Sequence, residues 1–251
     1  MQIQAVRTRV LVPPQDDLLE AIVQSDLAPN EGDCIAVSSK AVSIWEGRCV
    51  PVDHRNHEQR DVLAKGEATE WIHREHVPGR HAFWTLTNNL LISGAGIDAS
   101  NANDHFVLWP ACPHKSASEL HARLCEHFGL QTLAIIITDS HSTPLRRGAL
   151  GFALGWAGFD PLIDHRGKPD LFGRMLVSEH TNLADSLAAA AVLAMGETNE
   201  CTPLAVLRNV PQLAQALGRA AHHEPPFELT REQDIYAPFL LNALWQHGAD
   251  D

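Results

Sequence analysis

Positive charge is scarce in this 251-residue sequence: 19 lysines and arginines stand against 31 aspartates and glutamates, for a formal net charge of −12. Broad binding to a nucleic-acid backbone needs a basic surface, so the composition argues against that function. A small phosphorylated ligand stays compatible, because its site needs only a few local cations. No apolar run reaches the about 18 residues of a membrane-spanning helix, so we expect no membrane partner.

Paired cysteines are also missing. The five cysteines are scattered, and none forms a C-x-x-C pair. The first residues, MQIQAVRTRV, lack the apolar core of a signal peptide. Both features predict a cytoplasmic protein with reduced thiols. The sequence contains no P-loop lysine motif, Rossmann glycine fingerprint or serine-hydrolase elbow, which leaves P-loop and hydride-transfer chemistry without support.

The length suits one large domain, residues 1–251, or two closely joined subdomains. Expected strands and helices alternate irregularly, which favours an α+β fold over a regular doubly wound sheet. The expected strands cover residues 4–12, 34–38, 83–92, 132–138, 152–156 and 203–208. The expected helices cover residues 16–25, 57–75, 116–128, 183–195, 211–219 and 232–246.

Two apolar runs end in carboxylates. Residues 134–137 lead to Asp139 and Ser140, and residues 90–92 lead through small residues to Asp98. We expect each run to be a buried strand whose polar residues lie at its carboxyl end, where sheets often place ligands. Carboxylate and hydroxyl oxygens suit a divalent cation. A shared metal site is one interpretation; ordinary polar turns are the other.

Three basic side chains follow the first run. Arg146 and Arg147 carry guanidinium groups that fork onto phosphate or carboxylate. Structural ion pairing with the large acid excess is the alternative interpretation for both arginines. His141 is either a proton acceptor near an attacking amine or an exposed turn histidine.

Four stretches, taken in order, are typical of one family. They are GDCIAVSSKAVSIWEGR, GAGIDASN, IITDSHSTPLRRGALGFALG and KPDLFGR, and ADSLAAAAVLAMGE follows them. Together they resemble the coenzyme F-420-0:L-glutamate ligases, the gamma-glutamyl ligases of deazaflavin cofactor biosynthesis. The likeness spans about residues 15–210. Each piece alone is weak, and the combination is specific.

The resemblance implies the family's unusual mixed α+β fold, built as an intertwined homodimer. It implies a ligase that uses GTP and a divalent cation, Mg or Mn. The terminal phosphate of the nucleotide would activate the carboxylate of a small acid acceptor as an acyl phosphate. The amine of L-glutamate would then attack and form an amide.

The resemblance also implies roles for particular residues. The implied metal ligands are Asp98, Asp139, Ser140 and Glu197. The implied nucleotide contacts are Ser39, Lys40, Asn101 and Gly196. The implied catalytic residues are Asp139, Arg146 and Arg147, the arginines holding phosphate or carboxylate.

Several departures from the family pattern fall in the segments that would contact the nucleotide. Ile44 stands where the family pattern has a lysine, and Gly94 where it has an asparagine. TNECT, residues 198–202, replaces a glycine-rich stretch whose backbone N–H groups approach phosphates, and Glu200 adds an anion there. Three interpretations stay open: a divergent F-420 ligase, a related amide ligase with another acid, amine or nucleotide, and a metal- or phospho-metabolite-binding homologue without ligase activity.

Overall fold

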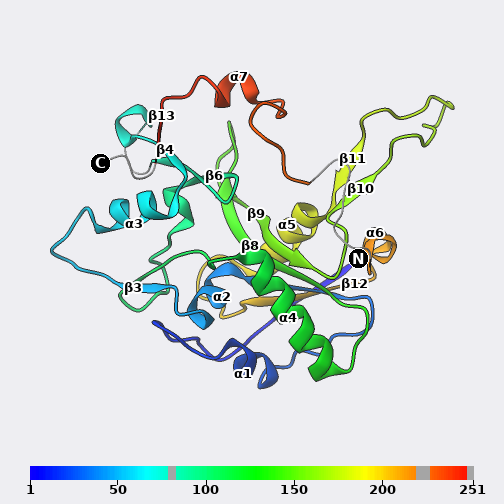
Figure 1. Cartoon of the computed structure of the whole chain (residues 1–251). Coiled ribbons are helices and arrows are strands. Elements are labelled where there is room, and N and C mark those ends of the chain that lie inside the picture. The colour runs from blue at the N-terminus through cyan, green and yellow to red at the C-terminus, as the bar shows by residue number, and fades with distance from the viewer. Residues whose placement is uncertain (79–82, 219–226, 248–251) are drawn as a thin grey trace. The chain divides into compact units, whose positions relative to one another are not determined.

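The computed structural model describes residues 1–78, 83–218 and 227–247 (Figure 1). Each of its two compact units combines helices with strands, which confirms the α+β class. No helix among the described residues is long and apolar enough to cross a membrane. Unit 1 comprises Met1–Leu11, Asp17–Val42 and Pro110–Pro225, and unit 2 comprises Val12–Asp16, Ser43–Trp109 and Pro226–Asp251.

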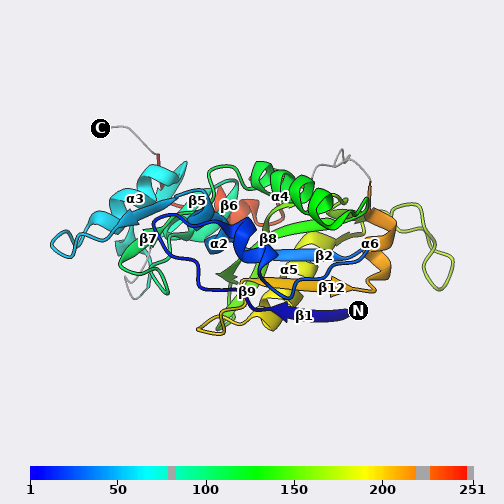
Figure 2. The ribbon, with the colours of Figure 1, turned by 90° about the horizontal axis from the view of Figure 1, so that it is seen from below.

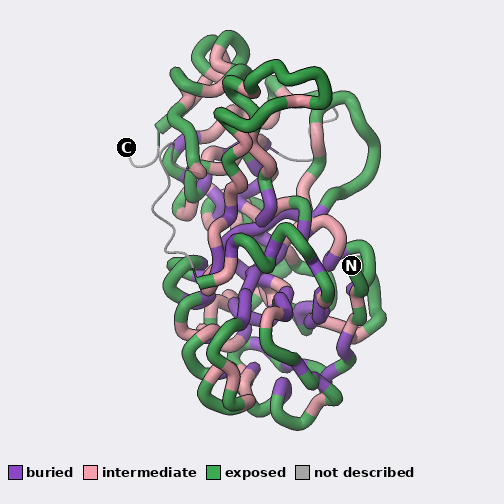
Figure 3. The backbone as a smooth tube through the Cα atoms, turned by 90° about the vertical axis from the view of Figure 1, so that its right-hand side faces the viewer, coloured by how far each residue is buried: buried purple, intermediate pink, exposed green. Residues whose placement is uncertain are grey.

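Unit 1 is built on a five-stranded sheet in the order β1-β12-β2-β8-β9. Only β2 and β8 pair in parallel, and the other neighbours are antiparallel. The strands are β1 (Gln2–Val6), β2 (Cys34–Ser38), β8 (Ala134–Ser142), β9 (Ala149–Ala157) and β12 (Leu204–Arg208). Figure 3 marks the buried residues in purple, and the first five residues of β8 are all buried.

Two helices cover the sheet on opposite faces, α4 (Pro113–Phe128) and α5 (Leu183–Met195) (Figure 2). This coverage explains why β8 reads as an uninterrupted apolar run rather than an alternating one. Glycines on β9 allow the close approach. A Cβ at Gly155 would lie 2.6 Å from the backbone of Pro113, and a Cβ at Gly151 would lie 2.6 Å from the side chain of Val192.

The expected strand end at Thr138 is wrong, because β8 continues to Ser142. The pairing with β2 stops where Ser38 lies opposite Thr138, but β8 continues to Ser142 because β9 still pairs with it. The β8–β9 register shifts by one residue after Ile137, which marks a β-bulge at this point. Asp139 therefore lies inside a strand, on a two-stranded hairpin beyond the end of β2, and not in a following turn.

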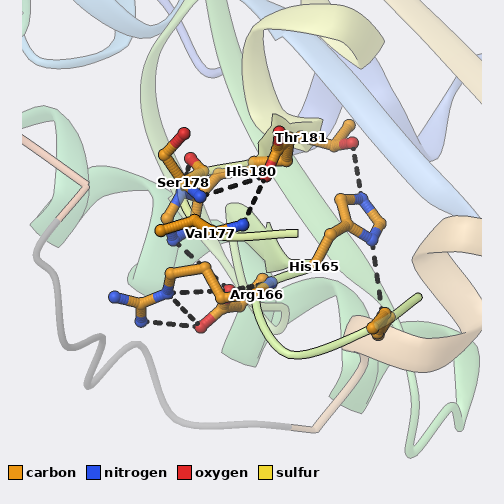
Figure 4. A network of polar contacts seen from close by, with 9 residues as sticks. His165, Arg166, Val177, Ser178, His180 and Thr181 are labelled. Carbon is orange, nitrogen blue, oxygen red and sulfur yellow. Dashed lines mark hydrogen bonds and ion pairs between the residues drawn. The ribbon is translucent and has the colours of Figure 1, made fainter. Parts of the chain in front are cut away.

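The remaining elements of unit 1 are α1 (Leu18–Val23), α6 (Pro211–Ala216), β10 (Leu162–Asp164) and β11 (His180–Asn182). The segment between β10 and β11 is mostly exposed and is tied together by polar contacts (Figure 4). His165 Nε2 lies 2.9 Å from Thr181 Oγ1. The Glu179 carboxylate accepts the backbone N–H groups of the two residues before it, at 2.9 and 3.0 Å.

Unit 2 contains a four-stranded antiparallel sheet in the order β13-β4-β5-β6 and the separate pair β3–β7. A small core packs Ala64, Phe83, Ala95, Ile97 and Leu108 together. The strands are β3 (Cys49–Pro51), β4 (Glu70–Ile72), β5 (Trp84–Thr87), β6 (Leu90–Ser93), β7 (His105–Val107) and β13 (Trp245–His247). The helices are α3 (Gln59–Glu67), α7 (Ala237–Leu240) and two 3₁₀ turns, Arg74–His76 and Gly94–Gly96; α2 (Ser39–Trp45) runs from unit 1 into unit 2.

Three sequence expectations in unit 2 are wrong. The expected strand 83–92 is the β5–β6 hairpin, because Asn88 and Asn89 turn the chain with φ of 50° and 58°. The expected helix 57–75 ends at Glu67, and β4 follows it as a partner of β5. The expected helix 232–246 shrinks to the four residues of α7, and β13 then pairs with β4. In each case pairing with another strand overrides the local helical or strand pattern.

Candidate functional site

Four of the predicted site residues form a continuous series of hydrogen bonds in unit 1. Ser39 Oγ donates to Asp139 Oδ2 at 3.0 Å, and the Ser140 N–H donates to Asp139 Oδ1 at 2.7 Å. Ser140 Oγ donates to Glu197 Oε2 at 3.2 Å. We call Ser39, Asp139, Ser140 and Glu197 the polar chain. Its members come from three separate parts of the sequence.

The fold explains this meeting. Because β2 and β8 run parallel, their carboxyl ends reach the same edge of the sheet. Ser39 follows the last residue of β2, and Asp139 lies one residue beyond the last pairing with β2. Helix α5 packs on β8 and β9 and ends at Met195, and the following Gly196, with φ of 82°, directs the chain into Glu197. Exposure to solvent increases along the polar chain: Ser39 is buried, Asp139 is half-buried and Glu197 is exposed.

The side-chain atoms of the polar chain that could bind a metal are all oxygens. Two carboxylates and a hydroxyl, from Asp139, Glu197 and Ser140, are the ligands that hard cations such as Mg²⁺ prefer. Over residues 1–78, 83–218 and 227–247, no cluster of three or more His, Cys, Asp or Glu is placed to hold a metal. The oxygens of the polar chain would supply only part of the ligands of a hard cation, with the rest from water or substrate, and the polar chain offers no soft ligand.

Basic groups lie on the elements that carry the polar chain. Lys40 is half-buried in the first turn of α2, directly after Ser39. Arg146 and Arg147 are exposed in the connection between β8 and β9. Within the described parts of the chain neither arginine forms an ion pair, so the expected alternative of structural pairing finds no partner there.

His141 is not the exposed turn histidine that one interpretation expected. It lies in β8, is half-buried, and packs edge-to-face on Phe152 with ring centroids 4.9 Å apart. Burial lowers the pKa of His141, and the negative charge of Asp185 opposes that shift. The imidazole is therefore biased toward its neutral form.

Asp98 and Asn101 lie in unit 2, where they form local structure. Asp98 Oδ1 accepts the Ser100 N–H at 2.7 Å, and Asp98 Oδ2 accepts the Ser100 hydroxyl at 2.9 Å. Its backbone pairs with Val107 as an isolated bridge. Asn101 is exposed with φ of 50°. This is the turn chemistry that the alternative interpretation of this segment expected.

In the loop that replaces the glycine-rich stretch, the Glu200 carboxylate accepts hydrogen bonds from a residue of the same loop. Glu200 Oε2 accepts the Thr198 N–H and Oε1 accepts the Thr198 hydroxyl, both at 2.9 Å. Hydrogen bonds from its own backbone N–H and from Thr198 lower the pKa of Glu200. A Cβ at Gly196 would lie 2.4 Å from Cδ of Glu200, so the carboxylate lies against the glycine. An internal anion thus occupies N–H groups of the loop.

Sequence reasoning assigned Ser39 to the nucleotide and did not link it to Asp139. The two residues are 100 positions apart, and no local pattern signals their contact. The sequence offers one signal: two apolar runs, which pair as β2 and β8 in the fold, are each followed by a hydroxyl or carboxylate residue.

Comparisons with known proteins cover most of the chain. A family model described as F420-0:Gamma-glutamyl ligase matches residues 6–209. A coenzyme F420:L-glutamate ligase of Methanopyrus kandleri is 34% identical over 231 residues, which cover 87% of this chain and 91% of that protein. A protein of the same name from Methanothermobacter thermautotrophicus is 34% identical over 200 residues, 72% of this chain and 76% of its own. The one from Methanococcus maripaludis strain C7 is 38% identical over 124 residues, 49% and 50% of the two chains. All four residues of the polar chain fall inside the matched range.

Proposed function

The chain belongs to the F420-0:gamma-glutamyl ligase family, as its motifs predict, and from this premise we propose a nucleotide- and metal-dependent amide ligase that joins L-glutamate to a carboxylic acid. The relatives' names support L-glutamate as the amine, and the description of the family supports F420-0 as the acceptor. The observation that carries the metal-dependent part is the polar chain, which gathers two carboxylates and two hydroxyls at one sheet edge.

The proposed reaction has two steps. An oxygen of the acceptor carboxylate attacks the terminal phosphorus of GTP, the bond to the GDP oxygen breaks, and an acyl phosphate forms. The amine of L-glutamate then attacks the acyl carbon, the C–N bond forms and inorganic phosphate leaves. The amine's proton passes to a base, for which the half-buried, neutral-biased His141 on β8 is suited.

Asp139, Ser140 and Glu197 would hold a divalent cation, Mg or Mn, which when bound would neutralise phosphate charge. Asp98, in unit 2, stays a proposed metal ligand. The arginines Arg146 and Arg147, which form no ion pair among the described residues, hold phosphate or carboxylate. The proposed nucleotide contacts are Lys40, Asn101 and Gly196, and Ser39, expected as a fourth, donates its hydroxyl hydrogen to Asp139. We propose that the protein works as a homodimer.

One observation favours a second candidate function. Because Glu200 closes the loop at residues 198–202, the nucleotide would meet an anion where a glycine-rich loop offers free N–H groups. This supports either a ligase with another acid, amine or nucleotide, or a homologue that binds metal or a phosphorylated metabolite without ligation.

Thermal unfolding with Mn²⁺, with GTP and with both tests the proposal. A ligand at a hundredfold excess over its Kd stabilises the folded state by about 2.7 kcal/mol. We expect a rise in Tm with Mn²⁺ that becomes much larger when GTP and Mn²⁺ are present together. A rise with Mn²⁺ that GTP does not increase would favour the binding homologue, and a larger rise with ATP than with GTP would correct the nucleotide. No rise with any combination would contradict the proposal.

A further inference from the structure

Ser39 is a buried hydroxyl that contacts a proposed metal ligand. Only 5% of the residue is exposed, and its Oγ lies 3.0 Å from Asp139 Oδ2. It opens α2 directly after β2, so the parallel pairing of β2 with β8 fixes its backbone beside Asp139. Its position is therefore set by the sheet and not by a loop.

The two oxygens of Asp139 are held by different donors. Oδ2 accepts the hydroxyl of Ser39, and Oδ1 accepts the backbone N–H of Ser140 at 2.7 Å. A serine hydroxyl has a single hydrogen to donate, and here it is donated to the carboxylate. Donors on both oxygens fix the rotation of the carboxylate.

We propose that Ser39 is a positioning residue: it orients the Asp139 carboxylate for metal binding and does not act as a direct nucleotide contact. This rests on the proposed function in one respect, the assignment of Asp139 as a metal ligand. Residues that hydrogen-bond to a metal ligand commonly set the affinity of the site for the metal, since they fix the geometry of that ligand before the metal binds.

The same helix contains a matched control. Ser43, four residues further along α2, is 1% exposed, and its Oγ has no hydrogen-bond partner in the described residues. Replacing either serine by alanine removes one buried oxygen atom from one helix. Only the change at Ser39 removes a donor from Asp139, so a merely structural effect of losing a buried hydroxyl would appear in both variants.

The test is the affinity for Mn²⁺ in the absence of nucleotide, measured by electron paramagnetic resonance of the free ion. We expect Ser39→Ala to weaken Mn²⁺ binding by about 10- to 100-fold, the usual effect of losing a partner of a metal ligand. Ser39→Thr keeps the hydroxyl and should keep most of the affinity. Ser43→Ala should bind like the unmodified protein, and Asp139→Ala should not bind at this site.

The outcomes separate the inference from the proposed function. If Ser39→Ala binds Mn²⁺ normally while Asp139→Ala does not, the positioning role is overturned and the metal site stands. If Asp139→Ala also binds normally, both the role of Ser39 and the metal assignment are overturned. Should Ser39→Ala fail to fold, Ser39→Cys fills the same space with a weak donor, and normal affinity in that variant would overturn the inference.

Discussion

The polar chain and the turn around Asp98 use the same residue types in opposite ways. In the polar chain, hydrogen bonds join residues 100 and 57 positions apart. In the turn, both oxygens of Asp98 bind Ser100, two positions away. Short-range contacts follow from local turn chemistry, whereas long-range contacts exist only after β2, β8 and α5 have packed. Long-range contact between polar groups is therefore the more specific sign of a built site.

The Glu200 loop belongs with the Asp98 turn in this comparison. Its carboxylate binds Thr198, two positions back, and lies against Gly196. The Glu200 carboxylate is hydrogen-bonded within its own loop, while the polar chain connects separate elements.

Asp139→Ala removes the acceptor that Ser39 and Ser140 share. We expect product formation to fall by more than about 100-fold, because the loss of a metal ligand exceeds that of a supporting partner. The circular dichroism spectrum should keep its native form, since the half-buried side chain adds little to the core. Phosphate release measures the effect. Undiminished turnover would remove the distinction between the two regions.

The double variant Arg146→Ala/Arg147→Ala tests the exposed cations. Charge-assisted hydrogen bonds contribute about 1.5–3 kcal/mol, so we expect KM for the anionic substrates to rise about 10- to 100-fold. The free energy of unfolding should change by less than about 0.5 kcal/mol, because both side chains are exposed.

Arg123→Ala is the matched control for these arginines. Arg123 is also exposed, but it pairs with Glu119 on α4 at 2.8 Å. We expect its KM values to stay unchanged. An equal rise in KM for Arg123→Ala would mean that net charge, and not a local site, binds the substrates.

Glu200→Gln tests the internal anion. Hydrogen bonds hold the pKa of Glu200 below its ordinary value, so the carboxylate is charged at neutral pH and loses its charge only in more acidic solution. Removing one unit charge about 4 Å from a phosphate should tighten nucleotide binding by about 1 kcal/mol, roughly fivefold. Titration calorimetry with GTP and Mn²⁺ measures the change.

Glu179→Gln is the control for that variant. Glu179 likewise accepts backbone N–H groups, in the segment between β10 and β11, and its pKa is lowered in the same direction. It should leave nucleotide affinity unchanged. Equal affinities of Glu200→Gln and the unmodified protein would show that the loop does not meet the nucleotide.

Asp98→Ala and Asp98→Asn give the smallest expected effect. Alanine removes both acceptors for Ser100 and should cost about 1 kcal/mol of unfolding free energy. Asparagine keeps one carbonyl acceptor and should retain most of that stability. If Asp98 also binds metal, Asp98→Asn will lose Mn²⁺ affinity without losing stability in urea. Equal destabilisation by both variants would contradict the turn assignment.

Local sequence signals predicted the elements that are bounded by turns and apolar runs. β2 (Cys34–Ser38) and α5 (Leu183–Met195) have the predicted bounds, since Gly32 precedes the strand closely and Gly196 ends the helix. Helix α4 starts three residues earlier than predicted, at Pro113, because proline is well suited to the first turn.

Long-range pairing decided the rest. β8 extends past its predicted end because it pairs with β9, and β13 forms in place of a predicted helix because it pairs with β4. The residue types indicated Asp139 and Ser140 as candidate site residues, and the family resemblance added Glu197. The structure brings these three together with Ser39. The hydrogen bond from Ser39 could not be predicted, because it depends on the parallel register of β2 and β8.

The most direct test of the proposed ligase activity is the mass of the product formed from GTP, Mn²⁺, L-glutamate and the deazaflavin acid F420-0. We expect phosphate release that requires both acid and glutamate, with a product heavier by a glutamyl unit. If a protein that binds GTP and Mn²⁺ releases no phosphate and yields no heavier product from this acid or from other carboxylic acids, the ligase assignment is contradicted.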